Sequence, residues 1–233
     1  MVLRKKAAGA QRKTSVFNGK RKINTERRAE IGKEKRAKTR SMLLQSAFNV
    51  LGVENGMFTT IEEICAEAGI SRGTFYNYFS SVAELYSALS YELSHEFVKA
   101  VLTITDQYPD AGERSAIAIR IYLERAMKDS RWGWGMVNIS AGGPIFGAET
   151  HAQVKRTVEE GLESGEFKLP SAEIGRDIIS GTTLSAMITL LRTIQHSSYP
   201  SLVAKQILIA LGVGEKAANE IVKRDLPRLG GRS

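Results

Sequence analysis

The sequence predicts an all-α protein with a small N-terminal head of three helices and a larger helical body. Apolar residues recur at three- and four-residue spacing along most of the 233 residues, as on one face of a helix. No segment shows the apolar and polar alternation of a half-buried strand, and no repeat of fixed period is present. With 42% hydrophobic and 25% charged residues, the composition is that of a folded chain with a buried core.

The first predicted helix follows a polar, helix-favouring stretch from Ile23 to Arg40. Its buried stripe is formed by Leu43, Leu44, Ala47, Phe48 and Leu51. We expect this helix to end near Gly56, because glycine readily adopts the left-handed conformation of a helix C-cap.

Two short helices are predicted next. Thr60 and Glu63 form a capping box, in which a hydroxyl and a carboxylate bind unpaired amides of a new helix, and Gly69 ends that helix. Ser71 is then a good N-cap for a third helix over residues 72–79. Two short helices joined by a tight, glycine-containing turn form a helix-turn-helix pattern. A second capping box, which begins at Ser81, starts a long fourth helix.

Beyond Pro109 the pattern stays helical, with helices expected over residues 110–128, 131–139, 149–164, 171–196 and 200–211. Residues 131–135 read Arg-Trp-Gly-Trp-Gly, and we expect a bend or opening there because glycine is unfavourable inside a helix. The predicted domains are a basic, flexible arm (1–32), a helix-turn-helix domain (33–85) and a helical ligand-binding and dimerisation body (86–225).

Charge is divided unevenly along the chain. Residues 1–40 hold 15 Lys/Arg and 3 acidic residues, a balance of +12; because the whole chain carries +8, the other residues carry −4. Residues 41–90 hold a single basic residue, Arg72, against five acidic ones. A strongly basic segment is typical of a protein with a polyanionic partner, nucleic acid first and an anionic membrane surface second. A solvated tail that keeps the protein in solution is the alternative.

Residues 59–85 read TTIEEICAEAGISRGTFYNYFSSVAEL. Together with Thr39, Arg40 and the apolar stripe of the first helix, this stretch resembles the N-terminal domain of the TetR family of bacterial transcriptional regulators. The resemblance covers about the first third of the folded chain; the remainder is similar only in its helix pattern. It implies a ligand-responsive repressor that binds a palindromic operator in double-stranded DNA as a homodimer and responds to a small-molecule effector.

A recognition helix presents hydrogen-bonding side chains to base edges in the major groove. By resemblance, Arg72, Gly73, Thr74 and Asn77 face base edges, with Arg72 the first candidate for reading guanine, while Thr60, Tyr76 and Tyr78 hold phosphates. Thr60 as a cap only, and Tyr78 as a core residue, remain open alternatives. The predicted DNA-binding residues are Lys38, Arg40, Thr59, Thr60, Ser71, Arg72, Gly73, Thr74, Tyr76, Asn77 and Tyr78.

The chain departs from the family at Ser80 and Val82, where the family commonly has lysines that contact phosphate. Phosphate neutralisation supplies essentially all non-specific affinity for DNA. We therefore expect the necessary positive charge to come from the basic residues of segment 33–40 and from the arm.

Two more sets of candidates follow from the resemblance. A largely apolar effector pocket between the fourth and eighth helices, with core packing as the alternative, has as candidates Tyr122, Trp132, Trp134, Met136, Phe146 and Met187. A dimer interface on the last two long helices, with burial inside one chain as the alternative, has as candidates Ile178, Thr182, Ser185, Thr189, Ile207 and Leu211.

The sequence gives less support to other classes of protein. A single cysteine, Cys65, and three scattered histidines argue against a disulfide framework or a metal site, and no cofactor is expected. We expect no enzyme, because no catalytic arrangement can be singled out and the Gly-rich stretch 141–147 has no phosphate-loop motif. Without a signal peptide or about 18 consecutive apolar residues, a cytoplasmic protein is expected. A DNA-coating protein without sequence preference remains an alternative.

Overall fold

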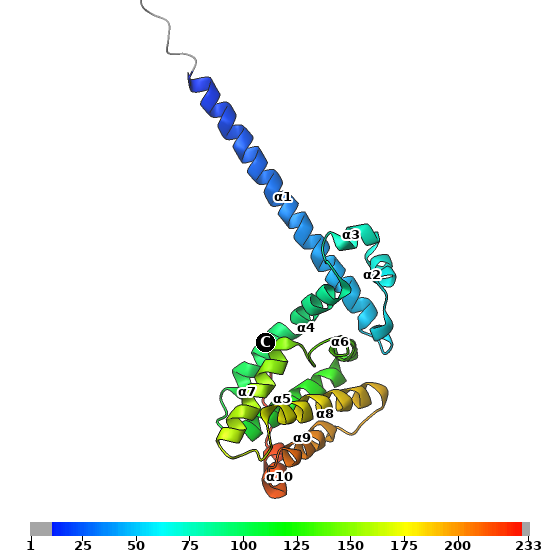
Figure 1. The fold of residues 1–233 in the computed structure, drawn as a ribbon, viewed down its shortest axis with the longest axis vertical. Coiled ribbons are helices and arrows are strands. Elements are labelled where there is room, and N and C mark those ends of the chain that lie inside the picture. The colour runs from blue at the N-terminus through cyan, green and yellow to red at the C-terminus, as the bar shows by residue number, and fades with distance from the viewer. Residues whose placement is uncertain (1–10, 230–233) are drawn as a thin grey trace, which may run out of the picture. The chain divides into compact units, whose positions relative to one another are not determined.

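The computed structural model describes the backbone of residues 11–229 and the side chains of residues 27–229. Within these residues the chain is helical and contains no strand, which confirms the all-α prediction (Figure 1). The chain divides into two compact units, residues 1–43 and 44–233.

The described helices are α1 (Gln11–Leu51), the short 3-10 helix η1 (Gly56–Phe58), α2 (Ile61–Ala68), α3 (Arg72–Tyr76), α4 (Val82–Thr105), α5 (Ala111–Lys128), α6 (Ser130–Ser140), α7 (Ala148–Glu163), α8 (Ala172–Arg192), α9 (Tyr199–Ala210) and α10 (Glu215–Lys223). Helix α10 is not among the helices predicted from the sequence, although Ala218, Ile221 and Val222 follow the three- and four-residue spacing that indicates a helix.

Helix α1 begins at Gln11, earlier than the composition suggests and inside the segment 1–32 predicted as a flexible arm. The described part of that segment is therefore helical. It contains no proline and many Lys, Arg and Glu residues, which have high helix propensity. Residues 1–10 lie outside the described residues, and the flexibility of the arm stays a prediction.

The short helices of the head begin at the predicted caps. The Thr60 hydroxyl accepts a hydrogen bond from the Glu63 amide (3.2 Å), and the Glu63 carboxylate accepts one from the Thr60 amide (2.7 Å). Gly69 ends α2 in the left-handed conformation, with φ 64°. These bonds satisfy amides and carbonyls that a short helix leaves unpaired.

Helix α3 is shorter than predicted, because it ends at Tyr76 and not at residue 79. The Tyr78 amide donates to the Phe75 carbonyl (2.9 Å), a bond over three residues that tightens the last turn. This turn leaves Phe79 fully buried beside Phe75, with 5.8 Å between the ring centroids. Core packing of these two rings therefore decides where the helix stops.

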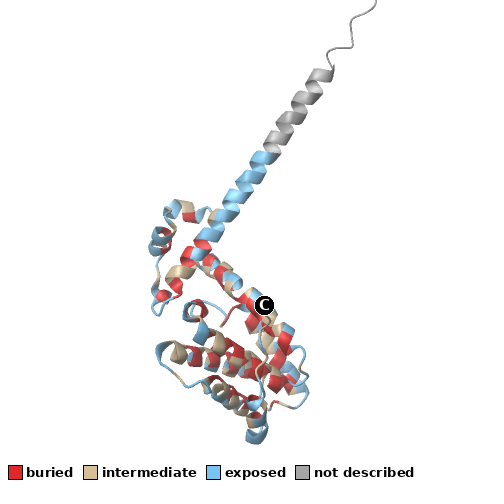
Figure 2. Cartoon of the chain, turned by 180° about the vertical axis from the view of Figure 1, so that it is seen from behind, coloured by how far each residue is buried: buried red, intermediate tan, exposed pale blue. Residues whose placement is uncertain are grey.

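The core of the body lies around α5, which packs against α8 and α9. Figure 2 shows buried residues gathered where these helices meet. Ile117, Leu123 and Ile207 belong to this core, and full burial of such a side chain stabilises a fold by about 1.5–3 kcal/mol.

One buried side chain of α6 forms hydrogen bonds with the end of α1 and the turn after it. Asn138 of α6 is 4% exposed, and its amide nitrogen donates to the carbonyls of Leu51 (2.7 Å) and Val53 (2.8 Å). The last carbonyls of a helix have no partner within the helix. Asn138 supplies a partner for the Leu51 carbonyl, and its second bond goes to the turn that follows α1. We call this contact between the end of α1 and α6 the α1–α6 junction.

Glycines allow the α1–α6 junction to close. A Cβ atom on Gly56 would lie 2.4 Å from the Leu51 carbonyl oxygen, and one on Gly52 would lie 2.6 Å from Arg131 Cγ. The predicted left-handed C-cap at Gly56 is therefore wrong: α1 ends at Leu51, and the left-handed glycines of the described residues lie elsewhere. Gly56 is needed for close approach.

The predicted bend at 131–135 is also wrong, because α6 is a continuous helix from Ser130 to Ser140. A Cβ atom on Gly135 would lie 3.0 Å from Phe48 Cε2, and one on Gly133 would lie 2.9 Å from Leu191 Cδ2. The helix propensity lost at these glycines is thus offset by close packing of α6 against α1 and α8.

We predict that Asn138→Ala lowers the free energy of unfolding by about 1–3 kcal/mol, because it leaves the buried Leu51 carbonyl without its side-chain partner. Denaturant titration of the variant measures this loss. Asn55→Ala, which changes an exposed loop residue, is the control and should stay within about 0.5 kcal/mol of the unsubstituted chain. Equal effects of the two substitutions would contradict the role given to Asn138.

Candidate functional site

The exposed face of α2 and α3 carries most of the candidate nucleic-acid contacts. Arg72, Gly73, Tyr76 and Asn77 are exposed at and after the short α3, while Phe75 between them is fully buried. This arrangement presents one side of α3 to solvent and anchors the other in the head. An exposed short helix after a tight turn has the form of a recognition helix.

Arg72 is held by an acidic residue of the neighbouring helix. Its guanidinium donates to the Glu62 carboxylate at 2.6 Å, and both side chains are more than half exposed. A hydrogen bond with Tyr76 and the charge of Glu62 raise the pKa of Arg72. The Glu62 carboxylate thus orients the charged guanidinium of Arg72, and a base edge or a phosphate would compete with Glu62 for its hydrogen bonds.

The other candidates on the head divide into exposed and half-buried residues. Thr60 and Ser71 are exposed and cap helices, Ser71 by accepting from the Thr74 amide at 3.1 Å. Thr59, Thr74 and Tyr78 are half-buried. The structure therefore gives Thr60 and Ser71 a local structural role, as the sequence alternative for Thr60 anticipated.

The acidic residues of the head have structural partners. Besides Glu62 and Glu63, Glu67 accepts from the Asn49 amide group (2.8 Å) and Glu54 from Arg192 of α8 (2.8 Å). Glu84 accepts from the amide of Ser80 (2.6 Å), one of the positions where the family commonly has lysine. These carboxylates stabilise helix ends and packing, which explains a negative head in a chain with a basic first helix.

Lys38 and Arg40 lie on α1 and are exposed, as are Lys33, Lys35 and Arg36. They belong to the compact unit of residues 1–43, whereas the other candidates belong to the unit of residues 44–233. The structure therefore brings together the candidates of α2 and α3 but leaves the relation of Lys38 and Arg40 to them a prediction.

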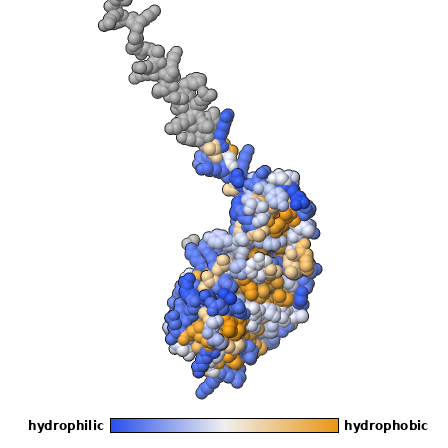
Figure 3. Space-filling view, viewed as in Figure 1, coloured by the Kyte–Doolittle hydropathy of each residue, from blue (hydrophilic) through white to orange (hydrophobic). Residues whose placement is uncertain are grey.

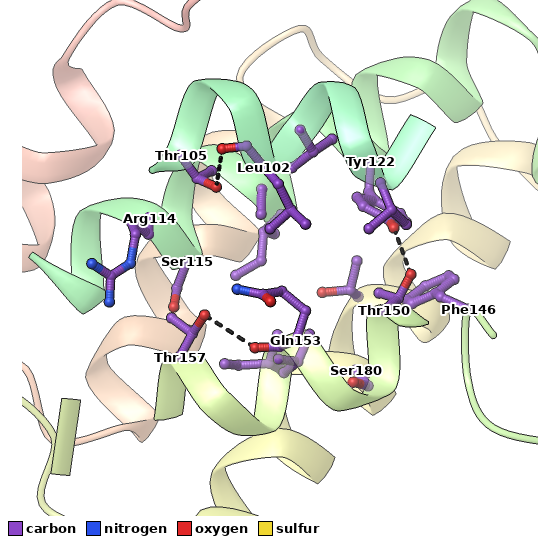
Figure 4. Close-up of a pocket in the computed structure, with 17 residues that line it drawn as sticks. Leu102, Thr105, Arg114, Ser115, Tyr122, Phe146, Thr150, Gln153, Thr157 and Ser180 are labelled. Carbon is purple, nitrogen blue, oxygen red and sulfur yellow. Dashed lines mark hydrogen bonds between the residues drawn. The ribbon is translucent and has the colours of Figure 1, made fainter. Parts of the chain in front are cut away.

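A second candidate site is a cavity of about 70 Å³ inside the body, lined by α4, α5, α7 and α8 (Figure 4). Of the predicted pocket residues, Tyr122 and Phe146 line it. The Tyr122 hydroxyl forms a hydrogen bond with the Thr150 hydroxyl (2.9 Å), and burial raises the pKa of Tyr122 to about 12. Tyr122 thus lines the cavity with a buried phenol whose hydroxyl is already paired.

The other predicted pocket residues lie outside this cavity. Trp132 is a core residue whose indole nitrogen donates to the Leu93 carbonyl of α4 (3.2 Å), and Met136 and Met187 are fully buried. Trp134 is half-buried, with the Arg192 guanidinium 5.9 Å from its ring centroid. These four residues pack within the fold and do not line the cavity, as the alternative of core packing expected. The sequence could not separate the two roles, because large apolar side chains are common in cores and in pockets.

The sequence pattern missed the polar lining of the cavity. Ser115, Thr157, Ser180 and Thr183 line it, together with Gln153. Polar residues on otherwise apolar helix faces were the available signal, because such residues need hydrogen-bond partners when buried.

The candidate dimer residues also divide. Thr182 and Ser185 are exposed, and Ile178 and Thr189 are half-buried. Ile207 and Leu211 are corrections to the prediction: they are 1% and 0% exposed and pack in the core of their own chain. They share the helical spacing of an interface, but α9 turns this face toward α5.

Exposed apolar side chains lie in more than one place on the described surface. Met57 and Phe58 precede α2, and Ile174 of α8 and Leu202 of α9 are 43% and 55% exposed. Figure 3 shows hydrophobic surface in separate patches on the face viewed. The described helices are all too short or too polar to cross a membrane. Among the described side chains, no three of His, Cys, Asp and Glu gather as metal ligands.

Two family models match the chain. One, described as bacterial regulatory proteins of the tetR family, matches residues 43–89, and the other, a tetracyclin repressor-like C-terminal domain, matches residues 110–224. The chain belongs to the TetR family. It is accordingly a DNA-binding transcriptional regulator, in which α2 and α3 are the helix-turn-helix and α5 to α10 belong to the matched C-terminal domain.

Solved TetR-family structures share the fold. RolR in complex with the ligand resorcinol is 25% identical, with a TM-score of 0.69 over 84% of this chain and 99% of that chain. RolR without ligand is 25% identical, with a TM-score of 0.65 over 82% and 100%. FadR from Bacillus subtilis in complex with stearoyl-CoA is 20% identical, with a TM-score of 0.53 over 73% and 96%, and shows the fold alone. The comparison with curated proteins gives no match.

We predict that Arg72→Ala weakens binding to a specific DNA site by about 1–3 kcal/mol, or about 5–150-fold, because a bidentate contact with a base is lost. Fluorescence anisotropy with a selected operator measures this change. Arg156→Ala removes an exposed arginine of α7 and is the matched control, with unchanged affinity. Loss of affinity that is equal for random DNA would instead assign Arg72 to phosphate.

Proposed function

We propose that this TetR-family regulator is a ligand-responsive repressor that binds a palindromic operator as a homodimer, acts in the cytoplasm and is not an enzyme. One observation carries the proposal: α4 begins directly after the helix-turn-helix and also lines the cavity of the body, through Val98, Val101, Leu102 and Thr105. A change in the cavity therefore reaches the DNA-binding segment through a single helix.

The size of the cavity supports a conformational response. Its volume of about 70 Å³ is smaller than the roughly 150 Å³ of a protein cavity that accepts benzene. A ring-sized effector has to widen the cavity and displace α4 or its neighbours. An effector shifts the protein toward the widened state only by as much as it prefers that state.

The loop before α7 is a second link between the cavity and α4. Phe146 lines the cavity and has a φ of 59°, which is unfavourable for a residue with a side chain. The next residue, Gly147, has a φ of 88°, and a Cβ atom there would lie 2.7 Å from Ser90 Oγ of α4. Movement of Phe146 by an effector would thus press on α4 near the head.

The DNA contacts proposed for Arg72, Tyr76 and Asn77 follow from their exposure on one side of α3. Gly73 supports the proposed DNA contacts in another way, through the absence of a side chain. A Cβ atom on Gly73 would meet nothing nearer than Ser71 Oγ at 3.8 Å, so packing within the chain does not require glycine there. Close approach of DNA backbone to the start of α3 gives this glycine a role.

The outer face of α8 and α9 is the proposed dimer interface. Thr182, Ser185, Tyr199, Leu202 and Val203 line a shallow groove between the two helices. The small residues of α8 permit a partner helix to approach closely, and the exposed Leu202 supplies apolar area to bury. Two-fold symmetry would then place two recognition helices about 34–36 Å apart, one turn of DNA.

Selection of bound sequences from random DNA tests the proposal. A palindrome with half-sites one turn apart, released by an effector, is the expected result. The first effector to try is resorcinol, the ligand of the solved RolR complex. Salt-sensitive binding without a preferred sequence would contradict the proposal and favour a DNA-coating protein.

We predict that Leu202→Glu shifts the protein from dimer to monomer and abolishes binding to the two half-sites together, because a buried unpaired carboxylate is costly. Sedimentation equilibrium measures the mass. Met127→Glu, at an exposed residue of α5 outside the proposed interface, should leave the dimer intact. A dimer that persists in Leu202→Glu would place the interface elsewhere.

We predict that deletion of residues 1–32, which removes 10 Lys/Arg and 2 acidic residues, weakens operator binding and flattens its salt dependence. Each phosphate contact that is lost reduces the slope of log affinity against log salt by about 1. Titrations at several salt concentrations measure both quantities. Unchanged affinity and slope would show that the arm only keeps the protein in solution.

A further inference from the structure

Three buried hydroxyl groups that line the cavity have no hydrogen-bond partner among the described residues. They belong to Ser115 of α5 and to Ser180 and Thr183 of α8, which are 5%, 3% and 3% exposed. Buried hydroxyls in folded proteins nearly always have partners, because an unpaired one pays its full desolvation cost. Three such groups around one cavity indicate that the site is built to bind polar atoms.

The rest of the lining is mostly apolar or already paired. Val98, Ile119 and Ile179 contribute apolar surface from three helices. The Tyr122 hydroxyl is paired with Thr150, and the Thr157 hydroxyl donates to the Gln153 carbonyl at 3.1 Å. A ligand therefore meets an apolar enclosure with hydrogen-bonding capacity at a few points.

The one lining residue with a charge is already neutralised. Arg114 donates to the carbonyls of Tyr108 (3.2 Å) and Pro109 (2.9 Å) and forms a salt bridge with Glu160. The phenol of Tyr122 is neutral at neutral pH, and burial moves its pKa further above the ordinary value. The cavity thus offers no unpaired charge to a carboxylate or phosphate, and enclosing a charged ligand would be costly.

The three hydroxyls belong to two sides of the cavity. Ser180 and Thr183 are three residues apart on α8 and so share a helix face. Figure 4 shows Ser115 beside Arg114 and Thr157, away from Ser180, with the Gln153 side chain between them. A ligand that satisfies all three hydroxyls therefore needs polar groups at two separated positions.

We infer that the effector is a small uncharged molecule with two hydroxyl groups on an apolar frame, one bound by Ser115 and the other by Ser180 and Thr183. The inference rests on the proposed function only in taking this cavity as the effector site. A hydroxyl both donates and accepts, so it pairs with a serine or threonine hydroxyl in either direction. Long or anionic effectors do not fit this lining.

The first test is the stability of the ligand-free chain. Thr183→Val keeps the side-chain shape and removes an unpaired hydroxyl, so it should raise the Tm by about 2–4 °C. Ser115→Ala should raise it in the same direction. Thr103→Val, which changes an exposed threonine of α4, is the matched control and should leave the Tm unchanged or slightly lower. A lower Tm in Thr183→Val would show that water already satisfies the hydroxyls and would overturn the inference.

The second test is calorimetric binding without DNA, with resorcinol, phenol, benzene and benzoate as probes. Resorcinol should bind about tenfold more tightly than phenol, phenol more tightly than benzene, and benzoate not at all. Thr183→Val and Ser115→Ala should each weaken resorcinol about tenfold, and Thr103→Val should not. Resorcinol that binds no more tightly than benzene, or benzoate that binds as tightly as resorcinol, would overturn the inference.

Release of a selected operator is measured separately, so that the two ideas fail in different ways. If resorcinol binds as expected but leaves the operator complex intact, the cavity's ligand class stands and the proposed repressor mechanism fails. If operator release occurs with benzoate and not with resorcinol, the regulatory mechanism stands and the ligand class fails.

Discussion

The two hydrogen bonds from Asn138 to the Leu51 carbonyl at the end of α1 and to the Val53 carbonyl just beyond it are the constraint on which the rest of the structure depends. They join the end of the first helix of the head to α6, in the core of the body. Glycines on both sides let the two parts meet closely enough for those bonds to form: Gly52 after α1, Gly56 at the start of η1, and Gly135 in α6. The side chain of Arg192 adds an exposed ion pair to Glu54 beside this contact. Because the body holds α1 in this way, α2 and α3 are presented from a fixed base.

The body has a second connection to the head, through α4, and the two connections have different consequences. The α1–α6 junction is glycine-lined and is hydrogen-bonded through the buried Asn138 side chain, so it resists change. Helix α4, in contrast, lines the cavity, where three buried hydroxyls have no hydrogen-bond partner among the described residues. Unpaired buried hydroxyls lower the free energy of unfolding, and proteins retain such groups mainly at functional sites. In the proposed mechanism the junction therefore acts as the pivot and α4 as the part that moves.

Much of the fold could be predicted from the sequence. The capping box at Thr60 and the caps at Ser71 and Ser81 marked helix starts, because hydroxyl groups at these positions accept hydrogen bonds from helix amides. The reciprocal half of the capping box predicted at Ser81 does not form, since the Glu84 carboxylate accepts from the Ser80 amide instead. Roles that depend on tertiary contact could not be predicted. Gly56 and Gly135 look like a helix stop and a bend in sequence, but both are places of close approach.

The candidate sites show the same limit. Arg72 and its neighbours lie on an exposed face as predicted, because local caps fix where α2 and α3 begin, although packing of Phe75 and Phe79 decides where α3 ends. Trp132, Ile207 and Leu211 have the size and spacing of pocket or interface residues, yet they fill the core, since periodicity gives the buried face of a helix but not what covers it. The lining hydroxyls escaped prediction because serine and threonine are common on exposed helix faces.

The central claim is that occupation of the cavity changes the spacing of the two recognition helices in a dimer. Spin labels at Ala83→Cys, an exposed position in the first turn of α4, measure this spacing directly when the buried native Cys65 is replaced by alanine. Double electron–electron resonance should give one distance distribution for the ligand-free protein and the operator complex, and a distribution shifted by several ångströms when resorcinol is bound. An unchanged distribution in protein saturated with resorcinol would contradict the account.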